Sequence, residues 1–266
     1  MTPRASSNGV RPPLRIVLLA ADDEFAGEMQ RLLYERHSEW IVGSVISSCV
    51  IYKKSNLGAA FFTLRRSGLL FLLQMVHIKM LRRSFNKNKP LLPSQLARKH
   101  GVERFISADI NDQQSVAKLR SWNPDLIIST NFSHYIGKTV RESVGRYACW
   151  NLHKSLLPQY RGMAPSFHAL LSGATEVGVT LHVVAKAFDT GDLVAQAEVP
   201  VTETDTVYSL NWKTSVSGGQ LLCSFLENYD PESTKATPQP VGDWRNYTYP
   251  TSCEVKAFLK KGLRFS

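Results

Sequence analysis

An amide, an imidazole and a carboxylate stand in this chain at spacings that could surround one reacting carbonyl group. Asn151 and His153 lie two residues apart, so at the end of an extended strand their side chains would point to the same face. Asp189 precedes a Thr-Gly pair, whose turn could carry the carboxylate back beside the other two groups. Three such groups around one carbonyl and one amine could move an acyl group.

Short apolar runs alternate with helical patterns through the first half of the chain and would position these groups. The runs are typical of strands buried in a parallel sheet and lie at 15–20, 40–47, 102–106, 126–130 and 147–152. Asp22 or Asp23 would begin one helix, Asp112 would begin another, and Gly101 would end a helix over 92–99. We therefore expect an α/β fold, an open Rossmann-like sheet of mostly parallel strands with helices on both faces.

The expected sheet also predicts where a ligand would bind. Ligands gather at the carboxyl ends of parallel strands. Asn151 and His153 follow one predicted strand, and residues 131–136 follow another, so both segments are expected on the same rim. The first strand is followed by acidic residues without a GxGxxG pattern, which disfavours a dinucleotide site there.

The second half of the chain predicts a helix over 165–171 and two strands over 178–184 and 193–201, which flank the Asp189 loop. Asp205 is expected to cap a long helix. The composition changes near residue 230. We therefore expect a catalytic domain at 14–230.

The two ends of the chain differ from this predicted domain. Residues 1–13 are expected to form a flexible basic arm. Residues 231–266 are expected to form a C-terminal extension, which is too short for an independent domain.

Charge and cysteine content bear on the partners and the compartment. The formal net charge of +10 suggests an anionic partner, although clustered Lys and Arg are also typical of a solvated face. The four cysteines are far apart and form no Cys-x-x-Cys pair, so neither a disulfide framework nor a metal site is expected. No signal peptide is recognised, and we predict a reducing, cytoplasmic location.

An apolar helical insertion is expected at about 57–85. Residues 67–81 are nearly all apolar and are bracketed by pairs of arginines. The run is shorter than the roughly 20 residues that span a membrane, and it contains Gln74, His77 and Lys79. A buried or half-buried helix is favoured. Contact with lipid or a partner protein through 67–81, or support of a homodimer, stays open.

Three segments carry a resemblance to a known family. Residues 151–162 read Asn-Leu-His-Lys-Ser-Leu-Leu-Pro-Gln-Tyr-Arg-Gly, residues 178–182 read Gly-Val-Thr-Leu-His, and residues 189–192 read Asp-Thr-Gly-Asp. They resemble the 10-formyltetrahydrofolate-dependent formyltransferases, which include glycinamide ribonucleotide transformylase, methionyl-tRNA formyltransferase and the sugar N-formyltransferases. The resemblance is strong from about residue 90 to about residue 210. It implies transfer of a formyl group from 10-formyltetrahydrofolate to an amine.

The resemblance also implies roles for the matching residues. Asn151, His153 and Asp189 would form the catalytic triad, with His153 donating as an imidazolium and Asp189 taking the proton of the amine. His182, within a predicted strand, is expected to have a structural or supporting role. The folate is expected against two loops, formed by Ser133, His134, Tyr135 and Ile136 and by Ser155, Leu156, Leu157 and Pro158. Substrate binding is assigned to Arg161 and Gly162.

The acceptor is predicted by elimination among the relatives. Methionyl-tRNA formyltransferases usually carry a complete C-terminal barrel, which about 35 residues after the boundary could not form, so tRNA is disfavoured. We expect a small biosynthetic amine, anionic or nucleotide-linked, and most of all a nucleotide-linked amino sugar. The alternatives are a methionyl-tRNA formyltransferase-like enzyme, a formyltetrahydrofolate hydrolase, and a catalytically idle basic protein that docks on a membrane or a partner.

Overall fold

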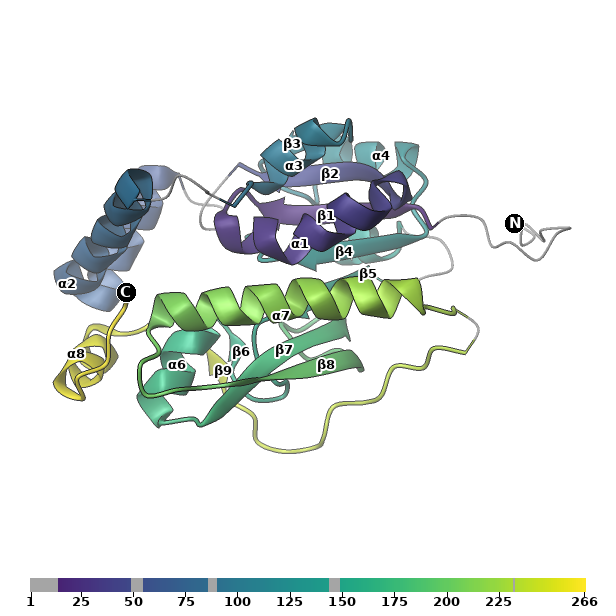
Figure 1. Ribbon diagram of the computed structural model, residues 1–266. Helices are drawn as coiled ribbons and strands as arrows, with labels where there is room; N and C mark the ends of the chain where they lie inside the picture. The colour runs from purple at the N-terminus through teal and green to yellow at the C-terminus, as the bar shows by residue number, and fades with distance from the viewer. Residues whose placement is uncertain (1–13, 49–54, 86–89, 144–148, 232) are drawn as a thin grey trace, which may run out of the picture.

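One seven-stranded sheet organises the chain in a computed structural model that describes residues 14–48, 55–85, 90–143, 149–231 and 233–266. The strand order is β3-β2-β1-β4-β5-β7-β8, and helices cover both faces of the sheet (Figure 1). The strands are β1 (Ile16–Ala21), β2 (Ile41–Ser47), β3 (Arg104–Ser107), β4 (Leu126–Thr130), β5 (Cys149–His153), β7 (Glu176–Val183) and β8 (Leu193–Pro200). Strands β1 to β5 are parallel, and β7 and β8 are antiparallel. The predicted Rossmann-like fold is confirmed, and the predicted arm at 1–13 lies outside the described residues.

Alternate side chains of β1 enter two separate cores. Ile16 and Leu18 pack with residues of α1 (Glu24–His37), α3 (Pro93–Lys99) and α7 (Val207–Glu227). Val17 and Leu19 pack on the other face with residues of α4 (Gln113–Ser121) and α5 (Lys138–Arg141). All four side chains are buried. Because both faces of β1 are covered, its sequence is a continuous apolar run that the pattern could locate.

Most predicted helix ends are confirmed by their caps, with one correction. Asp23 accepts a hydrogen bond from the backbone of Ala26 at 2.9 Å at the start of α1, and Asp112 caps α4. The cap of α7 is Thr206 and not the predicted Asp205. The hydroxyl of Thr206 accepts from Ser209 N at 3.0 Å, whereas the Asp205 carboxylate accepts from Lys213 Nζ at 2.7 Å. Asp205 lies one residue before the N-cap, and its carboxylate pairs with Lys213 in the second turn of the helix.

Strands β2 and β3 begin later than predicted. The strand expected from residue 40 starts at Ile41, because Ser38–Trp40 form a short 3-10 turn. The strand expected from residue 102 starts at Arg104. These shifts leave the order of the elements unchanged.

The apolar insertion forms α2 (Asn56–Phe85), which is broken at Gly68, where φ is 85°. It packs on α8 (Ser252–Lys260) at the periphery (Figure 1), where Phe71 contacts Phe265 with ring centroids 5.6 Å apart. Residues Leu57–Val76 have the length and apolar composition of a membrane span. The favoured prediction of a buried or half-buried helix holds in its half-buried form, because Ala59, Ser67 and Phe71 are buried while eight large apolar side chains of α2 are exposed. Contact of the exposed side with lipid or a partner stays a prediction.

The C-terminal extension is part of the same body and not a separate unit. β9 (Asn246–Tyr247) pairs with β6 (Arg161–Gly162), and Thr237 forms a bridge with Leu193 of β8. Phe258 of α8 stacks on Phe167 of α6 (Pro165–Ser172) in a third core. Residues after 230 therefore reach the segment that carries the Arg-Gly pair of the motif.

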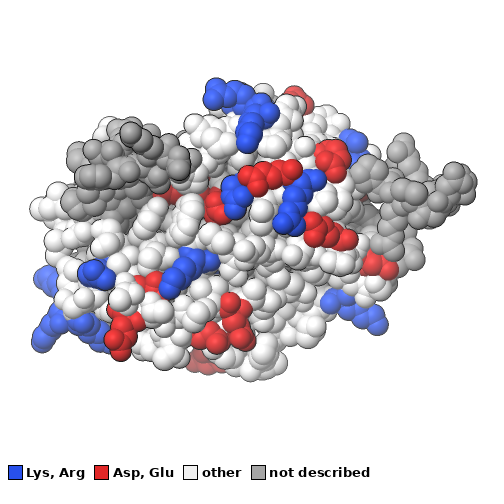
Figure 2. Space-filling model, in the orientation of Figure 1, with Lys and Arg blue, Asp and Glu red and all other residues white. Residues whose placement is uncertain are grey.

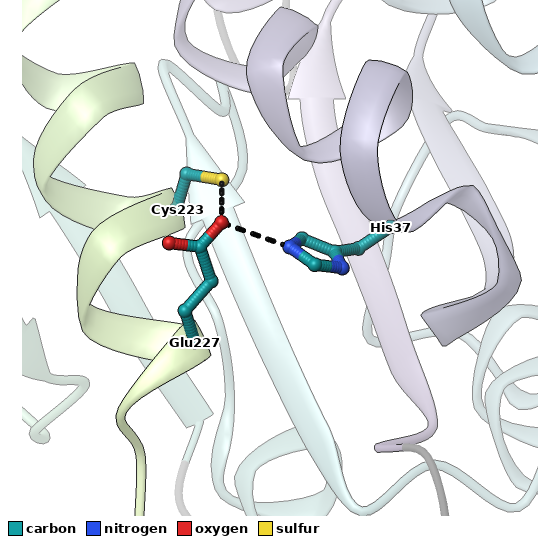
Figure 3. Close-up of side chains that lie close together, drawn as sticks. All are labelled: His37, Cys223 and Glu227. Atoms are coloured by element: carbon teal, nitrogen blue, oxygen red, sulfur yellow. Dashed lines mark hydrogen bonds and ion pairs between the residues drawn. The ribbon is translucent and has the colours of Figure 1, made fainter.

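Helices α1 and α7 lie side by side over one face of the sheet and are joined by a polar cluster near their carboxyl ends (Figures 1 and 3). The carboxylate of Glu227 lies 3.0 Å from His37 Nε2 and accepts from Cys223 Sγ at 3.5 Å. The hydrogen bond with His37 is the main cause that lowers the pKa of Glu227 below its usual range.

Charges on the face shown in Figure 2 are mixed. Basic and acidic side chains of the described residues alternate there, without a continuous basic groove. This arrangement is typical of a solvated face.

Candidate active site

One strand and one loop bring the predicted catalytic side chains together at the carboxyl end of β5. Asn151 and His153 come from β5, and Asp189 comes from the loop between β7 and β8. Asp189 Oδ2 lies 3.7 Å from His153 Nδ1, and Asn151 Nδ2 lies 3.5 Å from Asp189 Oδ1. The Asp189 side chain is only 12% exposed, so water screens these interactions weakly. Residues 189 and 151 are thus neighbours in space, as the turn at Thr-Gly predicts.

His182 belongs to this cluster more closely than the sequence indicated. It lies directly opposite Asn151 in the antiparallel pairing of β5 with β7. His182 Nδ1 donates to the carbonyl of Val183 at 2.9 Å, so in the neutral ring Nε2 accepts from Asn151 Nδ2 at 3.1 Å. Nε2 also lies 3.5 Å from Asp189 Oδ1. His182 thus holds the amide of Asn151 and lies next to the carboxylate of Asp189.

The amide of Asn151 is oriented by its neighbour on β4. Ser129 lies opposite Asn151 in the parallel pairing, and its hydroxyl donates to Asn151 Oδ1 at 2.5 Å. This hydrogen bond directs the Nδ2 group toward Asp189 and His182. The amide therefore presents its N–H groups, and not its oxygen, to the site.

The Asp189 carboxylate is held from the opposite side by β6 and the C-terminal extension. Gly162 N donates to Asp189 Oδ2 at 2.8 Å. Gln239 Nε2 donates to the backbone oxygens of Asp189 at 2.9 Å and Gly191 at 2.7 Å, and these bonds fix the loop. Asp189 itself has a φ of 53°, in the left-handed region. Such a conformation persists only where surrounding contacts hold it.

Charges and burial set the protonation states of the site. Burial raises the pKa of Asp189, but the two imidazoles and the Gly162 N–H outweigh this effect, and the net pKa lies below its usual range. Burial lowers the pKa of His153 and exceeds the opposing effect of Asp189. These shifts favour a carboxylate at Asp189 beside a neutral imidazole at His153 near neutral pH, and the role of His153 as an imidazolium donor stays a prediction.

The hydrogen bonds of His153 define its tautomer. Nε2 lies 3.1 Å from the carbonyl oxygen of Tyr160, which can only accept, so Nε2 carries the hydrogen. In the neutral ring Nδ1 is then unprotonated, and it faces Asp189. An Nδ1 atom in this position can accept a proton, and the adjacent carboxylate would stabilise the resulting charge.

The first predicted cofactor loop, Ser133 to Ile136, follows β4 and contacts the Asp189 loop. The hydroxyl of Tyr135 donates to Lys186 O at 2.9 Å, and its ring meets Phe188 edge-on at 5.5 Å. The buried side chain of His134 has a different use. It accepts from Ile110 N at 3.1 Å and lies 2.9 Å from Ser47 Oγ, and it ties the loop to β2. The side chain of His134 is therefore committed to the fold.

The second predicted cofactor loop, Ser155 to Pro158, is fixed against β7. The hydroxyl of Ser155 donates to Gln159 O at 2.7 Å, and Leu157 N donates to Thr180 Oγ1 at 3.0 Å. The bond between Leu157 and Pro158 is cis. The side chain of Leu156 lies over Gly178, where a β carbon would come within 2.5 Å of it.

Arg161 is placed beside the site but contacts the extension. Its guanidinium donates to Gln239 Oε1, the same side chain that holds the Asp189 loop. Burial lowers the pKa of Arg161, with Asp189 opposing the shift. Gln239 was not predicted as a site residue, because it follows the composition change at 230 and matches none of the motif segments.

Comparison with known proteins identifies the family. The sequence profile of the family described as Formyl transferase matches residues 79–226. The chain belongs to the formyl transferase family. The predicted resemblance is confirmed. The side chains that meet at the end of β5, which are Asn151, His153, His182 and Asp189, lie within the matched region of this family of formyl-transferring enzymes.

Relatives and structural neighbours place the chain within the formyl transferases. It is 39% identical over 126 residues to a methionyl-tRNA formyltransferase from Geobacillus sp. (strain WCH70), a match that covers 47% of this chain and 39% of that one. The chain thus matches well under two thirds of that relative's length. A fold match with glycinamide ribonucleotide transformylase 1 from Symbiobacterium toebii has a TM-score of 0.60 at 16% identity, over 88% of this chain and 100% of that chain.

A further neighbour was determined with two ligands. The N-formyltransferase from Helicobacter canadensis, in complex with folinic acid and dTDP-3-aminofucose, has a TM-score of 0.54 at 16% identity. The match covers 88% of this chain and 70% of that chain. At this identity the similarity establishes the shared fold.

Proposed function

We propose that this chain transfers a formyl group from 10-formyltetrahydrofolate to an amine. The observation that carries the proposal is the meeting of Asn151, His153 and Asp189 at the end of β5, within the matched region of the formyl transferase family. The donor set fits a formyl carbonyl, because N–H groups and a proton acceptor lie side by side. The bound folate would supply an activated formyl group.

Each of the three residues has a role that its contacts support. Asn151 Nδ2 faces the site and would donate to the negative charge that develops on the formyl oxygen. His153 Nδ1 would take a proton from the attacking amine and return it to the leaving nitrogen. Asp189 would stabilise the imidazolium that exists between these two steps. A new carbon–nitrogen bond forms as the old one breaks, and no covalent link to the protein is required.

The folate is proposed to lie against the loops at 133–136 and 155–158. Both loops meet the site, since Tyr135 contacts Phe188 and the second loop follows His153 directly. Their backbone groups would bind the pterin. A cytoplasmic location is part of the same proposal.

The proposed acceptor is a small amine linked to a nucleotide, with an amino sugar favoured. Arg161 lies beside Asp189 and could contact an anionic group of such an acceptor. The Helicobacter canadensis neighbour binds dTDP-3-aminofucose, which supports this class. The sequence relatives instead favour methionyl-tRNA as a second candidate.

A single assay with several acceptors tests the proposal. The purified chain is incubated with 10-formyltetrahydrofolate and with dTDP-3-aminofucose, methionyl-tRNA or no amine, and tetrahydrofolate release is followed by absorbance. We expect turnover with an amine and little without one, and Asp189→Asn should reduce turnover roughly 100-fold or more. Full-rate release of formate without an amine would indicate a hydrolase. Equal turnover by the Asp189→Asn variant would overturn the assigned mechanism.

A further inference from the structure

The exposed apolar surface of the described residues is concentrated on α2. Of the twelve large apolar side chains that are exposed, eight lie on this helix. Leu57, Phe61 and Leu64 follow one another at helical spacing before the break at Gly68, and Leu69, Leu73 and Val76 do so after it. Leu57 is 84% exposed and Phe61 is 64% exposed.

The opposite side of α2 is fixed to the folded body. Ser67 Oγ donates to Pro250 O at 2.5 Å, and Arg66 donates to the backbone oxygen of Tyr249 at 2.7 Å. Phe71 is buried against Phe265. The helix is therefore held in a defined orientation, and its apolar face is turned away from α8. The exposed apolar side chains, at 57–76, lie before the family-matched region, which begins at residue 79.

The positive charge of the segment that contains α2 favours an anionic partner. Between Trp40 and Val102 there are eleven lysines and arginines and no aspartate or glutamate. Two copies of this segment would repel each other across a symmetric interface. An anionic bilayer provides both an apolar interior and a negative surface, which together bind basic, apolar helices in the plane of the interface.

We propose that the exposed face of α2 binds the surface of an anionic phospholipid membrane. The contact is interfacial and leaves the sheet outside the bilayer.

Vesicle sedimentation tests the proposal directly. The purified chain is mixed with vesicles of phosphatidylcholine containing phosphatidylglycerol, and in parallel with pure phosphatidylcholine. We expect binding to the anionic vesicles at least about tenfold tighter than to the neutral ones, with a decrease at high salt. The double variant Phe61→Ser, Leu73→Ser should lose at least about tenfold of that binding. Ile106→Ser is the matched control, since Ile106 is 70% exposed on β3, and it should bind as the unchanged chain does.

Two further measurements keep the result decisive. The thermal unfolding midpoint of the double variant should equal that of the unchanged chain, because both side chains are exposed. Failure of the unchanged chain to bind anionic vesicles, or equal binding by the double variant, would overturn the proposal. Light scattering provides a third test. If the unchanged chain is a dimer and the double variant is a monomer, a second copy covers the apolar face and the proposal is overturned. Formyl transfer to a small amine is independent of this outcome.

Discussion

At the scale of single residues, burial and one carboxylate decide what His153 can do. Its pKa is lowered below the ordinary imidazole value of about 6.5. The ring is therefore neutral at pH 7 and becomes charged only as the pH falls below that value. The free energy that favours the folded state through this group is present above about pH 6.5 and is lost as the pH falls through the lowered pKa. A neutral ring with a free Nδ1 is suited to accept a proton first and to donate it afterwards.

The first prediction is a titration of His153 followed by nuclear magnetic resonance. The midpoint for the His153 ring, assigned with a His153→Gln variant, should lie below 6.5. Asp189→Asn should lower the midpoint further, because it removes the negative charge that opposes the shift. A midpoint above 6.5 in the unchanged chain would contradict the neutral resting state.

The second prediction concerns Gln239 as a positioning residue. Its Nε2 holds the Asp189 loop, and its Oε1 accepts from Arg161. Gln239→Leu removes both contacts, whereas Gln239→Glu keeps an acceptor for Arg161 and loses the donor to the loop. We expect both variants to lower kcat by roughly tenfold, as loss of positioning does, and only Gln239→Leu to raise KM for an anionic acceptor as well. Unchanged kcat in Gln239→Glu would show that the loop does not need this donor.

Residue types and short spacings made part of this site predictable. Asn151 and His153 are two apart on one strand, and their shared face follows from strand geometry alone. The contact of His182 with Asn151 depends on the register between β5 and β7, and a slip of one residue would turn His182 to the other face. Gln239 lies 50 residues beyond Asp189 in the chain, so only the folded extension brings the two together.

At the scale of secondary structure, caps determine where helices begin, and α7 allows a direct comparison of two candidates. Thr206 satisfies Ser209 N at the first turn, although Asp205 is the acidic residue that the sequence favours. We predict that Thr206→Ala lowers the free energy of unfolding by about 1 kcal/mol, the usual cost of a lost N-cap. Thr139→Ala, at an exposed position of α5, is the control and should change it little. Denaturant unfolding measures both, and equal effects would contradict the assigned cap.

Local patterns locate elements better than they place them against each other. Strands β1, β2, β4 and β5 were found because each is buried on both faces, and the caps of α1 and α4 were found from Asp23 and Asp112. The surroundings of α2 were not predictable in this way. An apolar run whose hydrophobic residues do not gather on one side of the helix has the same pattern in a core and on a surface. Only the position of α8 decides which side of α2 is covered.

At the scale of the whole molecule, one of the contacts between the C-terminal extension and the rest of the chain is a close backbone approach at Gly162. Gly162 has a φ of 93°, and a β carbon there would lie 2.1 Å from the carbonyl oxygen of Tyr247. The same residue donates its N–H to Asp189 and pairs β6 with β9. The stability of the β6–β9 pair and the position of the Asp189 carboxylate are therefore linked through Gly162.

The last prediction separates backbone strain from this link. Gly162→Ala should weaken the β6–β9 pair, displace the N–H from Asp189 and lower kcat by roughly 100-fold, the cost of a misplaced group of about 1 Å. Gly101→Ala is the matched control, because Gly101 also has a positive φ, of 69°, but a β carbon there meets nothing within 4 Å. Both variants should lose roughly 1–2 kcal/mol of folding free energy from left-handed strain, and only Gly162→Ala should lose activity in excess of its unfolded fraction. Equal activity per folded molecule in the two variants would mean that the extension covers the domain without positioning Asp189.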